Sequence, residues 1–295
     1  MPERDGYIPG VPCWVDTNQP DPEAAAAFYS GLFGWEVEDV MPSGSPVKYF
    51  IARIRGGDVA GIGPIPEGAP ATPVWNTYIS VESADDTATK VKAAGGEVLM
   101  EAGDVMEAGR AAVFSDPEGA AFCVWQPGQH KGARIVNEPG SLNFNGLNTR
   151  NPDAAKAFYA SVFGWRTLTL AGGVEMWTLP GYADDLERGD PGLRERTAAM
   201  GVPGFEDVVA SINPLAPDQP DIPAYWSVTF ATDDADEAAR KAAELGGTVV
   251  APPFDAPWAR VTVITDPQGA TFIANQFVPE NKDLASRASA SASAA

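Results

Sequence analysis

Histidine is almost absent from this sequence, and cysteine is scarce. The chain of 295 residues contains one histidine, His130, and two cysteines, Cys13 and Cys123. A metal site built from two histidines and one carboxylate is therefore impossible within one chain. Both cysteines stand in apolar, strand-like runs, which is typical of reduced, buried thiols in a reducing compartment. Nothing in the sequence requires a disulfide.

Long apolar runs and basic character are lacking as well. No apolar run approaches the roughly 20 residues that a membrane span needs, and the first residues lack the charged-then-apolar pattern of a signal peptide. With 20 Lys and Arg against 40 Asp and Glu, the formal net charge is -20. Such a charge repels nucleic-acid phosphates and anionic lipid surfaces. We therefore expect a soluble, cytoplasmic protein with no nucleic acid and no membrane as partner. Its oligomeric state, a monomer or a homodimer, is left open by the sequence.

One segment occurs twice and organises the chain. Residues 21–35, Asp-Pro-Glu-Ala-Ala-Ala-Ala-Phe-Tyr-Ser-Gly-Leu-Phe-Gly-Trp, return as residues 151–165, Asn-Pro-Asp-Ala-Ala-Lys-Ala-Phe-Tyr-Ala-Ser-Val-Phe-Gly-Trp. Each copy has an Asp or Asn cap, Pro in the first helical turn and Gly at the end, so each predicts a helix with well-defined bounds. The Phe and Tyr residues fall on one helical stripe, which indicates burial against a sheet.

Strand and turn patterns repeat the same plan in both halves and predict four βαβββ modules. We predict an α+β protein with domain one over residues 8–128, a linker over 129–140 and domain two over 141–278. Residues 279–295 end in a Ser/Ala low-complexity run and are predicted to be a disordered tail. Domain two carries an inserted loop over residues 182–205, which we expect to cover a cleft or an interdomain groove; a tolerated surface excursion is the alternative.

Two motifs, each present twice, resemble the vicinal oxygen chelate superfamily. They are the helix signature D-P-x-x-A-x-x-F-Y-x-x-x-F-G-W, with Asn for Asp in the second copy, and the turn D-P-x-G-A before the last strand of each half. This superfamily includes glyoxalase I, type I extradiol dioxygenases, fosfomycin-resistance enzymes and bleomycin-binding proteins, and the chain most resembles its tandem, two-domain actinobacterial members. The resemblance implies curved, mixed sheets that each enclose a cleft. Metal-dependent members place their ligands there, on the first, fifth and eighth strands of a domain.

Residues that do not suit a transition metal occupy the ligand positions implied by the resemblance. These positions fall on Trp14, Asn76 and Cys123 in domain one and on Phe144, Ser227 and Ile273 in domain two. Neither domain keeps the His, His and Glu set or its common Gln substitutes, so we predict no metal and no cofactor. An all-oxygen cation site that uses Asp16, on the same strand face as Trp14, is the alternative.

Strand alternation directs aromatic, amide and carboxylate side chains into the implied clefts. The predicted ligand-binding residues of domain one are Trp14, Asp16, Asn76, Tyr78, Cys123 and Trp125. Those of domain two are Phe144, Trp177, Ser227, Thr229, Ile273 and Asn275, with Trp258 nearby. Such a face suits a flat, apolar ligand that is held by stacking and oriented by a few hydrogen bonds. The alternative is that each cleft has lost its metal and filled with core aromatic residues.

These observations predict metal-independent binding, or sequestration, of a small aromatic or polycyclic molecule, as in antibiotic resistance of the sequestration type. The alternative is a metal-free enzyme of secondary metabolism, such as a lyase, isomerase, cyclase or hydroxylase-like protein, with Asp16, Tyr78 or Cys123 as catalytic acid/base candidates. A structural protein with filled clefts is a third interpretation. Arg110 and Arg260 begin equivalent strands, where each is predicted to form a salt bridge, or else to pair with an anionic substrate group.

Overall fold

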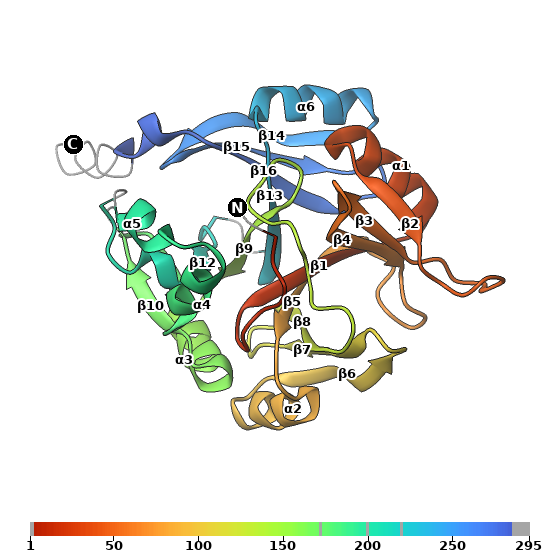
Figure 1. Cartoon of the computed structure of the whole chain (residues 1–295), viewed down its shortest axis with the longest axis horizontal. Helices are drawn as coiled ribbons and strands as arrows, with labels where there is room; N and C mark the ends of the chain where they lie inside the picture. Colours follow the sequence, from red (N-terminus) through yellow and green to blue (C-terminus); the bar gives the residue numbers. More distant parts are fainter. Residues whose placement is uncertain (1–2, 171–172, 199–200, 219–220, 285–295) are drawn as a thin grey trace.

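The computed structural model describes residues 3–170, 173–198, 201–218 and 221–284, and these form two sheets with helices packed on them (Figure 1). The first sheet contains β1 (Pro12–Gln19), β2 (Glu36–Asp39), β3 (Phe50–Ile54), β4 (Gly57–Pro64), β5 (Val74–Ser80), β6 (Glu97–Val105), β7 (Gly109–Ser115) and β8 (Ala121–Pro127). The second contains β9 (Leu142–Thr149), β10 (Arg166–Thr169), β11 (Glu175–Thr178), β12 (Val208–Pro214), β13 (Tyr225–Ala231), β14 (Thr248–Ala256), β15 (Ala259–Thr265) and β16 (Thr271–Phe277). The principal helices are α1 (Pro22–Phe33), α2 (Ala84–Ala93), α3 (Pro152–Phe163) and α6 (Ala235–Glu244).

The two sheets have the same strand order. It is β2-β3-β4-β1-β5-β8-β7-β6 in the first and β10-β11-β12-β9-β13-β16-β15-β14 in the second. In each sheet the first and fourth strands pair in parallel, as do the fifth and eighth, while the other neighbours are antiparallel. The predicted α+β fold, with four βαβββ modules in two mixed sheets, is therefore confirmed.

The repeated helix signature forms α1 and α3 with the predicted caps. The Asp21 carboxylate accepts hydrogen bonds from the backbone N–H groups of Glu23 and Ala24, and Gly34 ends α1 at φ 73°. Asn151 and Gly164 take the same roles in α3, where Gly164 has φ 74°. Glycine is suited to both helix ends because other residues rarely adopt this left-handed conformation.

Each signature helix is tied to the other domain. The Tyr29 hydroxyl of α1 donates to Asp266 Oδ2 (2.8 Å), in the Asp-Pro-x-Gly turn of domain two, and accepts from Trp75 Nε1 (2.9 Å). Tyr159 of α3 reaches Asp116 Oδ2 in the matching turn of domain one (3.3 Å). Figure 1 accordingly shows α1 beside α6 and α2 beside α3. The first module therefore packs against the fourth, and the second against the third, through two shared hydrophobic cores.

The insertion of domain two is helical in its described part, with α4 (Tyr182–Gly189), α5 (Leu193–Ala198) and the short 3-10 turn η2 (Phe205–Asp207). It contacts the N-terminal segment of the chain: the Arg4 guanidinium donates to the Tyr182 hydroxyl (3.2 Å) and lies over the ring of Tyr7 at 4.3 Å. The insertion therefore holds the segment that leads into β1, and its role as a lid stays a prediction.

The predicted tail is described up to residue 284. Its first residues form the 3-10 turn η3 (Pro279–Asn281), and Asn281 Nδ2 donates to the Ala259 carbonyl (2.9 Å). The rest of the predicted tail, residues 285–295, lies outside the described residues. No helix in the described part of the chain is long and apolar enough to cross a membrane.

Candidate functional site

Asp16 lies at the centre of the candidate site, on β1 between two neighbouring strands. In the sheet it is paired with Gly61 of β4 and with Asn76 of β5. Asn76 Nδ2 donates to Asp16 Oδ1 (2.8 Å), while the hydroxyls of Tyr78 and Tyr49 donate to Asp16 Oδ2 (2.9 and 3.0 Å). The carboxyl is only 4% exposed, so these three donors replace the water that it loses on folding. The structure thus brings together Asp16, Asn76 and Tyr78 from the predicted set.

The burial of this cluster changes its proton affinity. Burial raises the pKa of Asp16 above its usual value, and the hydrogen bonds from Asn76, Tyr78 and Tyr49 oppose the rise without cancelling it. Burial also raises the pKa of Tyr78 and of Tyr49 well above the usual value, and the Asp16 carboxylate adds to the rise in both. Both phenols therefore remain protonated donors. A carboxyl in this setting can accept a hydrogen bond from a ligand hydroxyl or exchange a proton with it.

Tyr49 is the site residue that the sequence reasoning missed. It ends the loop over residues 40–49, between β2 and β3, and its ring lies against Gly61 and Gly63 of β4. A Cβ atom added to either glycine would come within 2.7 Å of the ring. The signal for this contact is the Gly-x-Gly pair in β4, because glycine inside a strand often marks the close approach of another group.

The interdomain linker fills one end of the concave face of domain one, where Trp14 and Trp125 lie. The His130 ring lies edge-on to Trp14, with ring centres 4.5 Å apart, and to Trp125 at 5.8 Å. Trp125 Nε1 donates to the His130 carbonyl (2.9 Å), and the two indoles are only 3% and 6% exposed. Both tryptophans belong to a hydrophobic cluster. The arrangement in which a ligand lies between them is therefore not available while the linker is in place.

The two cysteines are free, buried thiols, as the sequence predicted. Cys123 lies on β8 beside Tyr78 of β5. Burial raises the pKa of the Cys123 thiol far above neutrality, and the nearby Asp16 carboxylate raises it further. A thiol in this state is a poor nucleophile and a poor acid/base group at neutral pH. This disfavours Cys123 among the catalytic candidates.

The concave face of domain two is more open and carries other side chains. Its predicted residues Phe144, Ser227, Thr229, Ile273 and Asn275 are all partly exposed. Thr229 of β13 is paired with Phe144 of β9 and Ile273 of β16, so these three share one region of the sheet. The position that matches Asp16 is a glycine, Gly146, which is paired with Ser227. The centre of this face therefore lacks the carboxylate that organises domain one.

The prediction for Trp177 is wrong. Its ring is 1% exposed and lies in the hydrophobic core, with its centre 5.0 Å from that of Tyr159 and 5.2 Å from that of Trp165. The neighbouring residue Met176 is paired with Ser211. Strand alternation therefore places Met176, and not Trp177, on the concave face. Trp258 lies in the turn between β14 and β15 and stacks on Phe277, with ring centres 6.2 Å apart.

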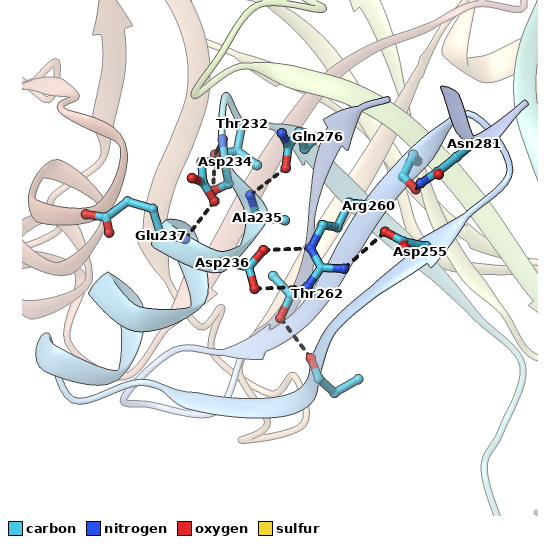
Figure 2. A network of polar contacts seen from close by, with 12 residues as sticks. Thr232, Asp234, Ala235, Asp236, Glu237, Asp255, Arg260, Thr262, Gln276 and Asn281 are labelled. Atoms are coloured by element: carbon cyan, nitrogen blue, oxygen red, sulfur yellow. Dashed lines mark hydrogen bonds and ion pairs between the residues drawn. The ribbon is translucent and has the colours of Figure 1, made fainter. Parts of the chain in front are cut away.

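Arg110 and Arg260 form the ion pairs that the sequence predicted. Figure 2 shows that Arg260 joins the start of α6 to the end of β14: its Nε and Nη2 donate to Asp236 (2.6 and 3.0 Å) and its Nη1 to Asp255 (3.0 Å). Arg110 makes the matching contacts with Asp85 and Asp104 in domain one. Both guanidinium groups therefore connect a helix to a hairpin, which favours the predicted salt bridges over pairing with an anionic substrate group.

The residues at the implied ligand positions do not fit a metal ion. Within the described residues, no group of three or more His, Cys, Asp or Glu side chains could hold one. Asp16 is the carboxylate at the centre of domain one, and both of its oxygens already accept hydrogen bonds. Trp14, Asn76 and Cys123 offer an indole, an amide and a protonated thiol, which is not a ligand set for a transition metal.

Comparison with known families agrees with the fold and with its duplication. The sequence matches the Glyoxalase/Bleomycin resistance protein/Dioxygenase superfamily over residues 14–124 and again over residues 141–273. The chain therefore belongs to this superfamily, and the double match confirms its tandem organisation.

One relative of the chain is CFP32 of Mycobacterium bovis and Mycobacterium tuberculosis, which is provisionally named a glyoxylase. It is 41% identical over 285 residues, which cover 95% of this chain and 100% of the relative. The anthracycline biosynthesis protein DnrV of Streptomyces peucetius is 34% identical over 281 residues, covering 90% and 93%. Among solved structures, the Mn(II)-bound glyoxalase of Novosphingobium aromaticivorans has a TM-score of 0.57 at 17% identity, with 91% of this chain and 82% of that chain covered. The 2,3-dioxygenase LapB of Pseudomonas sp. KL28 has a TM-score of 0.58 at 12% identity, covering 92% and 93%. At such identities, the likeness to the two solved structures shows the fold alone.

Proposed function

We propose that this protein binds a small, flat aromatic or polycyclic molecule, without a metal ion, on the concave face of domain one. The observation that carries the proposal is the buried Asp16 carboxyl, held by Asn76, Tyr78 and Tyr49, which are themselves partly exposed on that face. Aromatic rings around one fixed hydrogen-bonding centre suit a flat ligand with few polar groups.

The name of one relative supports this ligand class. DnrV is named an anthracycline biosynthesis protein, and anthracyclines are polycyclic aromatic compounds. Binding without turnover would sequester such a molecule, and sequestration of a toxic one would give antibiotic resistance. We place the protein in the cytoplasm, because two free, buried cysteines are typical of a reducing compartment.

Titration with a planar probe tests the proposal. We expect 1,4-dihydroxyanthraquinone to bind the purified protein in the presence of a chelator, as measured by calorimetry. Tyr78→Ala removes a partly exposed ring of the site and should weaken binding by about 1 to 2 kcal/mol, or about 5- to 30-fold. The matched control is Thr229→Ala at the equivalent position of domain two, which should leave the affinity unchanged.

Two results would contradict this function. If the wild type binds no planar aromatic probe, the ligand class is wrong. If Thr229→Ala weakens binding and Tyr78→Ala does not, the binding site lies on the open face of domain two, around Phe144 and Ile273.

The raised pKa of Asp16 favours a second candidate function, which is proton transfer to or from a bound ligand in a metal-free isomerase, lyase or cyclase. Asp16 would exchange the proton, and the Tyr78 hydroxyl, 2.9 Å from its Oδ2, would orient the carboxyl. Mass spectrometry of the ligand after incubation in heavy water separates the two functions. Binding alone leaves the mass of the ligand unchanged once its hydroxyl deuterium has been exchanged back in ordinary water. Proton transfer at carbon instead leaves carbon-bound deuterium in the ligand, and Asp16→Asn should not introduce it.

A further inference from the structure

The Tyr49 ring occupies a slot in the sheet face of domain one. Gly61 and Gly63 form the floor of the slot, and a side chain at either position would collide with the ring. In domain two, Ser211 takes the place of Gly61 in the strand register, opposite Gly146, and the floor there carries side chains. The slot is therefore a feature of the same domain that carries Asp16.

Two groups recognise the phenolic oxygen at the end of this slot. The Tyr49 hydroxyl donates to Asp16 Oδ2 (3.0 Å), and Trp14 Nε1 points toward the same hydroxyl oxygen from 3.5 Å. Asp16 Oδ2 also accepts from the Tyr78 hydroxyl, so this one oxygen receives two phenolic donors. An acceptor and a donor arranged around one oxygen match a neutral phenol, which both donates and accepts.

Tyr49 is attached to the sheet through a surface loop. The loop over residues 40–49 is closed by a hydrogen bond from Val40 N to the Tyr49 carbonyl (3.0 Å) and contains a turn from Ser45 N to the Pro42 carbonyl (2.9 Å). Strand β3 begins after it, at Phe50. Because the paired part of β3 begins at Phe50, the Tyr49 side chain can leave the slot while Phe50 stays paired with Asp39. A movement of the whole loop would break the bond from Val40 N to the Tyr49 carbonyl.

We propose that a phenolic ring of the ligand takes the place of Tyr49 in the slot, with its hydroxyl donating to Asp16 Oδ2 and the loop moved aside. This inference rests on the proposed function and narrows its ligand class to hydroxylated aromatic molecules. The exchange conserves the hydrogen bonds of Asp16, because one phenol replaces another. An aromatic ring without a hydroxyl would leave Asp16 Oδ2 with one donor fewer, which disfavours its binding.

The variant Tyr49→Gly empties the slot, and its affinity for p-cresol tests the inference. This molecule has the ring and the hydroxyl of a tyrosine side chain. Because Tyr49 competes for the slot in the wild type, we expect p-cresol to bind at least about tenfold more tightly to Tyr49→Gly. Tyr49→Phe keeps a ring in the slot without its hydrogen bond and should have intermediate affinity. Toluene, which lacks the hydroxyl, should bind Tyr49→Gly at least about tenfold more weakly than p-cresol does. Calorimetry and the ligand-induced rise in melting temperature measure these affinities.

The matched control is Val47→Gly, which loosens the same exposed loop but leaves the slot filled, and it should bind p-cresol as the wild type does. Equal affinity of Tyr49→Gly for p-cresol and toluene would overturn the phenol specificity. Equal affinity of the wild type and Tyr49→Gly for 1,4-dihydroxyanthraquinone would overturn the displacement of Tyr49 and leave the proposed function standing. If p-cresol binds Tyr49→Gly selectively but neither protein binds the polycyclic probe, the proposed polycyclic ligand is wrong while the phenol slot stands.

Discussion

Truncation of Trp125 to alanine tests whether the filled end of the concave face belongs to the core or contacts the ligand. The indole is 6% exposed, packs against His130 with ring centres 5.8 Å apart, and donates to the His130 carbonyl (2.9 Å). Loss of a buried Trp side chain typically costs about 3 to 5 kcal/mol, and the lost hydrogen bond adds about 1 kcal/mol. We therefore expect the free energy of unfolding to fall by about 4 to 6 kcal/mol. At roughly 2 to 4 °C per kcal/mol, the melting temperature would fall by about 8 to 24 °C.

Urea denaturation and ligand titration on the same Trp125→Ala protein separate the two roles. The variant should bind 1,4-dihydroxyanthraquinone within about threefold of the wild-type affinity when it is measured below its melting temperature. Asn275→Ala, at the equivalent and partly exposed position of domain two, is the matched control and should lose no more than about 1 kcal/mol of stability. A stability loss under about 1 kcal/mol together with a large loss of affinity would refute the assignment of Trp125 to the core. It would show that Trp125 contacts the ligand and that the linker does not block this end of the face.

Four further measurements address the fold, the charge state, the metal and the insertion. Tyr29→Phe takes a donor from Asp266 and an acceptor from Trp75, so the free energy of unfolding should fall by about 1 to 3 kcal/mol; an unchanged urea midpoint would contradict the pairing of the first and fourth modules. Burial raises the pKa of Asp16 in the folded protein, so the free energy of unfolding should decline as the pH rises from about 3.9, the pKa of Asp in the unfolded chain, through the pKa of the folded state. Asp16→Asn should lack this decline, and parallel curves of stability against pH for the wild type and the variant would refute the raised pKa. Purified protein should contain no stoichiometric metal and keep its affinity for the probe in chelator, whereas about one Fe, Zn, Ni or Mn per chain by elemental analysis would overturn this. Amide exchange over residues 182–205 should slow at saturating probe if the insertion covers a cleft, and unchanged exchange would make it a surface excursion.

The fold was predictable because its signals are local and occur twice. A capping Asp or Asn, a first-turn Pro and a terminal Gly are read from neighbouring residues, and α1 and α3 begin and end where these signals place them. The pairing of modules across the two domains was not predictable in this way. Tyr29 and Asp266 both stood in recognised motifs, but their hydrogen bond depends on how two distant modules pack.

Strand alternation predicted the part of the site that lies in regular strands. Asp16 and Asn76 sit opposite each other on β1 and β5, as the period of two requires. Trp177 shows the limit of that rule, because a shift of one residue moves a side chain to the other face of the sheet. In β11, Trp177 is paired with the buried Ala210, on the core face, and Met176 is paired with Ser211. Tyr49 and His130 come from a loop and a linker, whose positions follow from tertiary packing and have no sequence period.

Comparison of the two halves of the chain supports the proposal that the binding site lies in domain one. Residues shared by the copies make the same structural contacts in both, as Arg110 and Arg260 do with their acidic partners. The copies differ on the concave faces, where Asp16, Gly61 and Tyr78 of domain one correspond to Gly146, Ser211 and Thr229 of domain two. Both halves must satisfy the same packing requirements, so packing alone does not explain a buried carboxyl, a glycine floor and two phenols in one half only. Burial of the Asp16 carboxyl requires the three donors that surround it, and the presence of this whole arrangement in domain one alone supports the proposed recognition of a ligand there.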